Sequence, residues 1–189
     1  MSYLQNAGAF LLQSIAGFVI VIFLLRVMLI VINAPFNEPV CRFVYLLTNP
    51  AVTPLRKIVP RRGRIELAAI LIAWVAAAVE LGLLAAMFGQ PSGAATLLVR
   101  AMVDVLDWAV LIQLVAIFAY CILSFIPSLR YDSNFSLLAR FVDPVVRPFR
   151  RLLPPLGGLD FSCWFASVAL ILVRLLVIAP LSDFAMHLG

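Results

Sequence analysis

Four long apolar runs dominate the pattern of hydrophobic and polar positions along the chain. They cover residues 9–32, 67–88, 96–126 and 161–182, and few polar side chains interrupt them. A helix over the first run is roughly 36 Å long, which exceeds the hydrocarbon core of a bilayer at about 30 Å. The pattern therefore predicts four transmembrane helices.

Two segments between the spans, residues 33–66 and 127–160, are too polar to cross a membrane and too apolar to be free loops. We call them the first and the second cassette. In each, apolar residues recur at helical spacing, which predicts an amphipathic helix at the membrane surface. The predicted apolar stripes are Val40, Phe43, Val44 and Leu47 in the first cassette, and Phe135, Leu138, Phe141 and Val142 in the second.

A further short helix is predicted in each cassette, at Asn49-Pro50 and at Asp143-Pro144. In both places a good N-cap residue precedes a proline, which suits the first turn of a helix. Pro54 lacks an amide in the second turn and is expected to kink or tighten the first of these helices. Glu66 stands at the start of the second span, where we expect its carboxylate to cap the helix.

The two cassettes are versions of one motif, 94 residues apart, and they align without a gap. The matching positions are Pro50, Pro54, Arg56, Lys57, Pro60, Gly63 and Glu66 in the first, and Pro144, Pro148, Arg150, Arg151, Pro154, Gly157 and Asp160 in the second. Such a match predicts an internal duplication. The expected fold is an all-α membrane protein of two parallel helix–interfacial cassette–helix repeats, residues 1–89 and 96–189.

Composition supports membrane insertion and gives the topology. Hydrophobic residues make up 65% of the 189 residues and charged residues 12%, against roughly 45–50% and 25% in soluble domains. The net charge of +5 arises from 14 Lys and Arg, most of them in the cassettes. Membrane topology explains this clustering better than nucleic-acid binding does. By the positive-inside rule, the cassettes are expected to be cytoplasmic and both termini outside.

The doubled motif resembles that of the YggT family, also called YlmG, of small bacterial integral membrane proteins. The match runs from Pro50 to Glu66 and from Pro144 to Asp160, and Leu24-Leu25-Arg26 is similar to the family's first helix. Glu66 stands where an aspartate is commoner. The resemblance implies a non-enzymatic membrane protein linked to osmotic or ion stress tolerance, cell division or assembly of membrane complexes. We expect it in the bacterial inner membrane and without a cofactor.

The basic pairs Arg56-Lys57 and Arg150-Arg151 are the candidate binding residues. On surface helices they can hold anionic lipid head groups or an acidic partner, each cation contributing roughly 1 kcal/mol near anionic lipid. The alternative is that they only fix the orientation of the chain. Expected partners are membrane lipids, and a membrane protein or a second copy of the chain.

Few ionisable residues lie within the spans. Glu80 and Arg174 occupy the same position in the two repeats and are predicted to pair, as a structural lock or as a gate. Arg26, near a helix end, is expected to reach the interface, and Gln113 to form a hydrogen bond across the bundle. Arg100, Asp104 and Asp107 are placed outside the membrane core, in the first turns of the third span.

The sequence predicts no enzyme, since its one histidine, His187, lies near the end of the chain and no metal or nucleophile motif can be assembled. The leading prediction is a scaffold or assembly factor acting through basic cassettes. The alternative is a small channel or transporter with a site between the repeats.

Overall fold

The structure, a computed structural model, describes residues 3–35, 38–57, 65–89, 93–124, 126, 133–152 and 162–187. Its helices are α1 (Tyr3–Val31), α2 (Pro39–Leu55), α3 (Leu67–Phe88), α4 (Ala94–Ser124), α5 (Ser133–Leu152), α6 (Ser162–Val173), the π-helical segment η2 (Arg174–Ile178) and α7 (Ala179–Met186). The last three run on as one helix, which we call the fourth span.

Among the described residues, four helices are long and apolar enough to cross a membrane: Tyr3–Val31, Leu67–Met87, Ala94–Ser124 and Ser162–Met186. The prediction of an all-helical membrane protein with four spans is confirmed at this level. The first span begins six residues before the predicted boundary, and the fourth ends four residues beyond it. Near that end, Pro180 has no amide to donate, and a π-helical turn precedes it.

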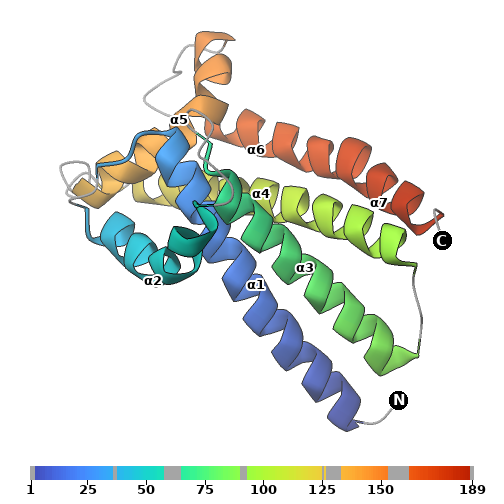
Figure 1. Ribbon diagram of the computed structural model, residues 1–189. Helices are drawn as coiled ribbons and strands as arrows, with labels where there is room; N and C mark the ends of the chain where they lie inside the picture. The colour runs from blue at the N-terminus through green and yellow to red at the C-terminus, as the bar shows by residue number, and fades with distance from the viewer. Residues whose placement is uncertain are drawn as a thin grey trace.

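The four spans run side by side, and the two cassette helices lie together at one end of them (Figure 1). Helix α1 packs against α3, α3 against α4, and α4 against the fourth span. The start of α1, the end of α3, the start of α4 and the end of the fourth span lie at the opposite end (Figure 1). Gly89 ends α3 there in the left-handed conformation, with φ of +64°.

In the described part of each cassette one helix is present, where two short helices were expected. Asn49 and Pro50 lie inside α2, and Asp143 and Pro144 lie inside α5. An internal proline removes a backbone hydrogen bond and is costly when the freed carbonyl is buried. Here Pro50 and Pro54 are exposed, so surrounding polar groups can satisfy the freed carbonyls. This exposure lets a helix continue through residues that normally begin or end one.

The face of α2 that packs on the protein is not its predicted apolar stripe. The buried side chains of α2 are Cys41, Val44, Thr48 and Val52. Of the predicted stripe only Val44 is buried, whereas Phe43 is 60% exposed. Because the surroundings of a membrane-surface helix are themselves apolar on one side, apolar residues do not identify the face that packs on protein. In α5, Phe141 and Val142 are buried as expected.

Candidate functional site

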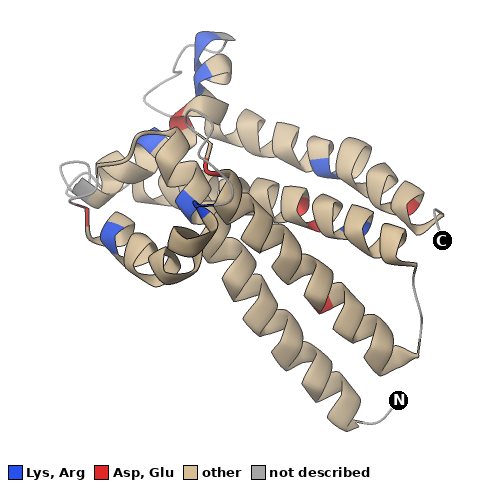
Figure 2. Cartoon of the chain, in the orientation of Figure 1, with Lys and Arg blue, Asp and Glu red and all other residues tan. Residues whose placement is uncertain are grey.

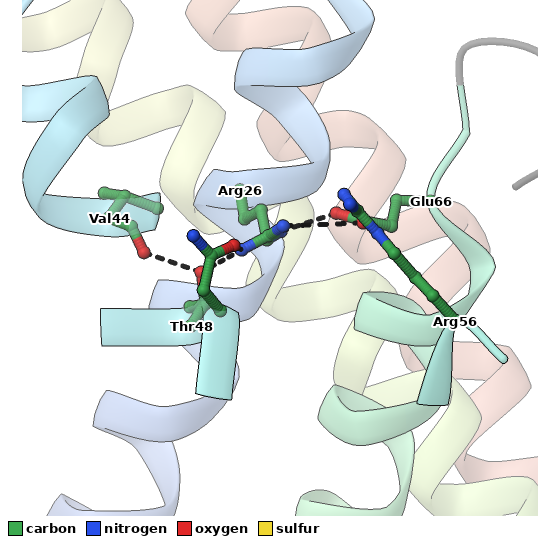
Figure 3. A network of polar contacts seen from close by, with 6 residues as sticks. Arg26, Val44, Thr48, Arg56 and Glu66 are labelled. Atoms are coloured by element: carbon green, nitrogen blue, oxygen red, sulfur yellow. Dashed lines mark hydrogen bonds and ion pairs between the residues drawn. The ribbon is translucent and has the colours of Figure 1, made fainter. Parts of the chain in front are cut away.

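A buried arginine, Arg26 of α1, organises the junction between α1, α2 and α3 (Figure 3). Its side chain is 1% exposed. Arg26 Nη1 donates hydrogen bonds to Thr48 Oγ1 at 2.6 Å and to Asn49 Oδ1 at 2.9 Å. The guanidinium carbon lies 4.8 Å from the centre of the Tyr45 ring. Arg26 is therefore buried under α2, which supplies polar partners.

Glu66, immediately before α3, supplies the countercharge. Arg26 Nε donates to Glu66 Oε2 at 2.5 Å, and Arg56 Nε donates to Glu66 Oε1 at 2.6 Å. The carboxylate makes no capping hydrogen bond to α3, so the predicted capping role is wrong. A buried carboxylate gains more from two guanidinium groups than from one backbone amide at a helix start. The network of Arg26, Glu66, Arg56, Thr48 and Asn49 is here called the Arg26 cluster.

Glu66 is ionised in this cluster. Burial alone would raise the pKa of its carboxyl, but the hydrogen bonds and positive charges of Arg26 and Arg56 outweigh burial and hold the pKa below its ordinary value. Burial, with the charge of Glu38, raises the pKa of the Cys41 thiol in α2. Cys41 is thus a packed thiol with low reactivity at neutral pH.

A second cluster lies at the corresponding positions of α4 and α5. Tyr120 and Arg150 stand 94 residues after Arg26 and Arg56. Arg150 Nη2 donates to Tyr120 Oη at 3.0 Å, and the guanidinium lies 5.6 Å from the ring centre. Asp143, at the position of Asn49, forms an ion pair with Arg147 and lies 3.9 Å from Arg150. The second half thus has a tyrosine where the first has the buried arginine.

The four predicted binding residues fall into two kinds. Arg56 and Arg150 are held from within by the contacts above, whereas Lys57 and Arg151 are exposed and form no ion pair within the described part of the chain. Figure 2 shows most of the described basic residues gathered around α2 and α5, with others on α4 and the fourth span. The motif positions Pro60, Gly63, Pro154, Gly157 and Asp160 lie outside the described residues.

Arg174 pairs with Asp107 in place of the predicted Glu80. Arg174 Nε lies 2.6 Å from Asp107 Oδ1, and Nη2 lies 2.7 Å from Oδ2. Helix α4 packs directly along the fourth span and supplies the acid. Corresponding repeat positions set the depth of two residues but not the direction of their side chains. The expectation that Asp107 stays outside the core is also wrong, since it lies in the middle of α4.

Gln113 forms the expected hydrogen bond across helices. Its side chain is 9% exposed, and Nε2 donates to the carbonyl oxygen of Phe141 at 3.1 Å. This bond ties α4 to α5 just where α5 has Pro144 and Pro148 within its next two turns. It fixes the second cassette helix on the bundle.

Comparison with known proteins places the chain among bacterial relatives. The profile of the CCB3/YggT family matches residues 5–87 and 99–181. An uncharacterized protein of Pseudomonas aeruginosa is 33% identical over 181 residues, which are 95% of this chain and 92% of the relative. The Escherichia coli K12 protein named YggT, also described as uncharacterized, is 28% identical over 158 residues, 84% of this chain and 82% of the relative. No solved structure matches.

Proposed function

Because the chain belongs to the CCB3/YggT family, we propose that it is a non-enzymatic scaffold or assembly factor of the bacterial inner membrane, serving osmotic or ion stress tolerance or cell division. It acts through the basic surface of α2 and α5, which binds anionic head groups or an acidic membrane partner. The relatives show only that the chain belongs to the family. The argument for binding rests on the residues of α2 and α5.

A repeat organisation with cytoplasmic cassettes is part of the proposal. The two profile matches have bounds that are both 94 residues apart, 5 with 99 and 87 with 181. Helices α2 and α5 lie at the same end of the spans (Figure 1). Most of the described basic residues gather at that end, which favours the cytoplasmic side. The Tyr120–Arg150 contact, at the positions of Arg26 and Arg56, adds support for a duplication.

The observation that carries the proposed function is that one residue of each basic pair is bound within the protein and the other is exposed. Glu66 holds Arg56, and Tyr120 holds Arg150. The next residues, Lys57 and Arg151, are exposed cations without an acidic partner among the described residues. A cation that the protein does not neutralise attracts an anionic lipid or an acidic protein surface. We name these two residues the basic platform.

Removal of the two charges of the basic platform tests the proposal. In cells from which the gene has been deleted, the Lys57→Gln/Arg151→Gln variant should fail to restore growth under salt stress, although its abundance in the membrane equals that of the wild type. The matched control is Lys57→Arg/Arg151→Lys, which keeps both charges and should restore growth. Full rescue by the glutamine variant would exclude the platform as the functional surface.

A second candidate, a small channel or transporter, is favoured by a cavity of about 420 Å³ between α4 and the fourth span. Asp104, Asp107 and Arg174 line it, and ionisable residues within spans commonly mark ion or substrate paths. The π-helical turn begins at Arg174, and such turns recur at functional sites. The cavity lies within the second half, so it is not a site between the repeats.

Ion flux separates the two candidates. Purified protein in liposomes is tested for K⁺, Na⁺ and H⁺ flux, with Asp107→Asn as the variant. The scaffold proposal predicts flux no greater than in empty liposomes. A selective flux that Asp107→Asn abolishes would replace the scaffold with a transporter.

A further inference from the structure

A second cavity, of about 460 Å³, lies where α1, α2, α4 and α5 meet. Its lining is apolar apart from Asn134 and the indole N–H of Trp108. It is open at the side, since Val115 of α4 is 60% exposed and Val40 of α2 is 48% exposed. We call it the inter-half groove. None of the residues of the basic platform lines it.

The groove covers about one leaflet of a bilayer. Along α4 its lining extends from Trp108 to Ala119, which is roughly 17 Å at 1.5 Å per residue. The hydrocarbon core is about 30 Å thick. At the surface end the groove is bounded by α2 and α5, and towards the middle of the spans by Trp108. A Cβ atom at Gly17 would lie 3.2 Å from the Trp108 ring, so α1 and the indole meet closely there.

The length of the groove indicates which kind of molecule fits it. An apolar groove that opens towards lipid does not retain water, and an empty one loses dispersion contacts along its whole lining. A transmembrane helix of a partner crosses the full core and would extend well beyond Trp108. One hydrocarbon chain of a lipid, entering from the leaflet beside α2 and α5, ends near the middle of the membrane and matches the groove.

Charge at the surface end selects the head group. Arg140 of α5 is exposed and lies one helical turn after Leu137, which lines the groove, so its side chain is on the groove's edge. Arg42 of α2 is also exposed, but it is two residues from Val40 and from Val44, so it faces away from the groove. Basic residues beside a groove between transmembrane helices are typical of sites for anionic phospholipids.

We propose that the inter-half groove binds one anionic phospholipid, with an acyl chain between α1 and α4 and its phosphate near Arg140. The lipid joins the two halves of the molecule. This site is independent of the basic platform, because it depends on the groove and Arg140 and not on Lys57 or Arg151. Each proposal can therefore fail alone.

Trp108 provides a direct test by fluorescence. In a Trp74→Phe/Trp164→Phe variant Trp108 is the remaining tryptophan, and phosphatidylglycerol brominated on its acyl chains is titrated into the protein in a non-ionic detergent. We expect saturable quenching at about one lipid per protein. In the matched Trp74→Phe/Trp108→Phe variant, the remaining Trp164 is 61% exposed and lies outside the groove, so its quenching should not saturate at low lipid.

Native mass spectrometry with phosphatidylglycerol tests the residues. Ala119→Trp fills the groove and should weaken retention of one lipid by about tenfold or more. The control Leu176→Trp, at a 70% exposed position of the fourth span, should leave it unchanged. Arg140→Gln should lower the preference for phosphatidylglycerol over phosphatidylcholine by about fivefold. Arg42→Gln, on the opposite face of α2 from the groove, should leave the preference unchanged.

Three results would overturn the proposal. One is equal, unsaturable quenching of Trp108 and Trp164 in the two single-tryptophan proteins, which does not depend on any groove-filling substitution. Another is equal retention of phosphatidylglycerol and phosphatidylcholine by the wild type. The third is a lipid-free dimer as the species that Ala119→Trp disrupts, because then a second copy of the chain would occupy the groove.

Discussion

The Arg26 guanidinium lies in a transmembrane helix and yet has partners on several sides. Glu66 provides the countercharge, Thr48 and Asn49 accept hydrogen bonds, and the Tyr45 ring lies within cation–π distance. An isolated arginine at the centre of a span costs roughly 2.5–3.5 kcal/mol on insertion scales. A buried pair is tolerated only when hydrogen bonds satisfy both groups. The Arg26 cluster meets this condition.

Breaking one side of this pair should be costly. Arg26→Leu and Glu66→Leu are each expected to lower the free energy of unfolding by about 3–5 kcal/mol, because each leaves a buried charge without its main partner. The double variant should lose clearly less free energy of unfolding than the two single variants lose together. Unfolding in detergent micelles measures all three, with Arg147→Leu, from an exposed pair, as a control of about 0.5 kcal/mol or less. Additive losses would show that the two side chains act separately.

The pH dependence of stability has a defined sign at Glu66. Its pKa is lower in the folded state than in the unfolded state, so the unfolded chain binds the proton more readily. The stabilisation is fully present above the ordinary glutamate pKa, about 4.3, and is lost as the pH falls through the lowered value. Thermal unfolding between pH 3 and 7 should show a smaller acid loss for Glu66→Gln than for the wild type. Parallel curves would contradict ionisation of Glu66 in the cluster.

The Arg26–Glu66 pair could not be predicted by local reasoning. Its members are 40 residues apart, and each had a plausible local role, capping for Glu66 and interface contact for Arg26. The usable signal is that opposite charges lie at the same end of consecutive spans. The predicted Glu80–Arg174 pair is wrong for a different reason. Corresponding positions in the two repeats lie at the same depth, but this does not determine the direction in which their side chains point. Asp107 lies on the neighbouring helix, facing Arg174.

Among the elements, the cassette helices depart most from their expected form. Their existence follows from apolar residues at helical spacing and from their position between spans. Their length does not, because Pro50 and Pro144 resemble helix starts. The packed face of α2 was also missed, since Thr48, a polar residue, lies on it to meet Arg26. Burial of a polar residue by a distant partner leaves no local signal.

The internal prolines provide a test of how the cassette helices are held. Pro54→Ala and Pro148→Ala should raise the free energy of unfolding by about 1–2 kcal/mol. Alanine restores a backbone N–H and its helical hydrogen bond, and this gain outweighs the added freedom of the unfolded chain. Thr53→Ala, at an exposed position of the same turn, is the matched control and should change little. Thermal unfolding provides the comparison. Destabilisation by the alanines would mean that the bend imposed by proline is required for packing.

Over the whole molecule, the spans form a row whose members fan apart from the end that holds α2 and α5 (Figure 1). The fourth span contacts the row mainly through α4, and most of its side chains are exposed. Sequence reasoning predicts the number and order of the spans because their apolar runs are long. It cannot predict which spans touch, since lipid and protein present equally apolar surroundings to a helix.

The central proposal is that the basic residues of α2 and of α5 both face the cytoplasm. Site-directed labelling tests it most directly. Cysteines are introduced singly as Lys57→Cys, Arg151→Cys and Ala94→Cys, in a background whose three native cysteines are alanine, and a membrane-impermeant maleimide is applied to oriented vesicles. Positions 57 and 151 should react only in inside-out vesicles, and position 94 only in right-side-out ones. Reaction of 57 and 151 in vesicles of opposite orientation would contradict the account.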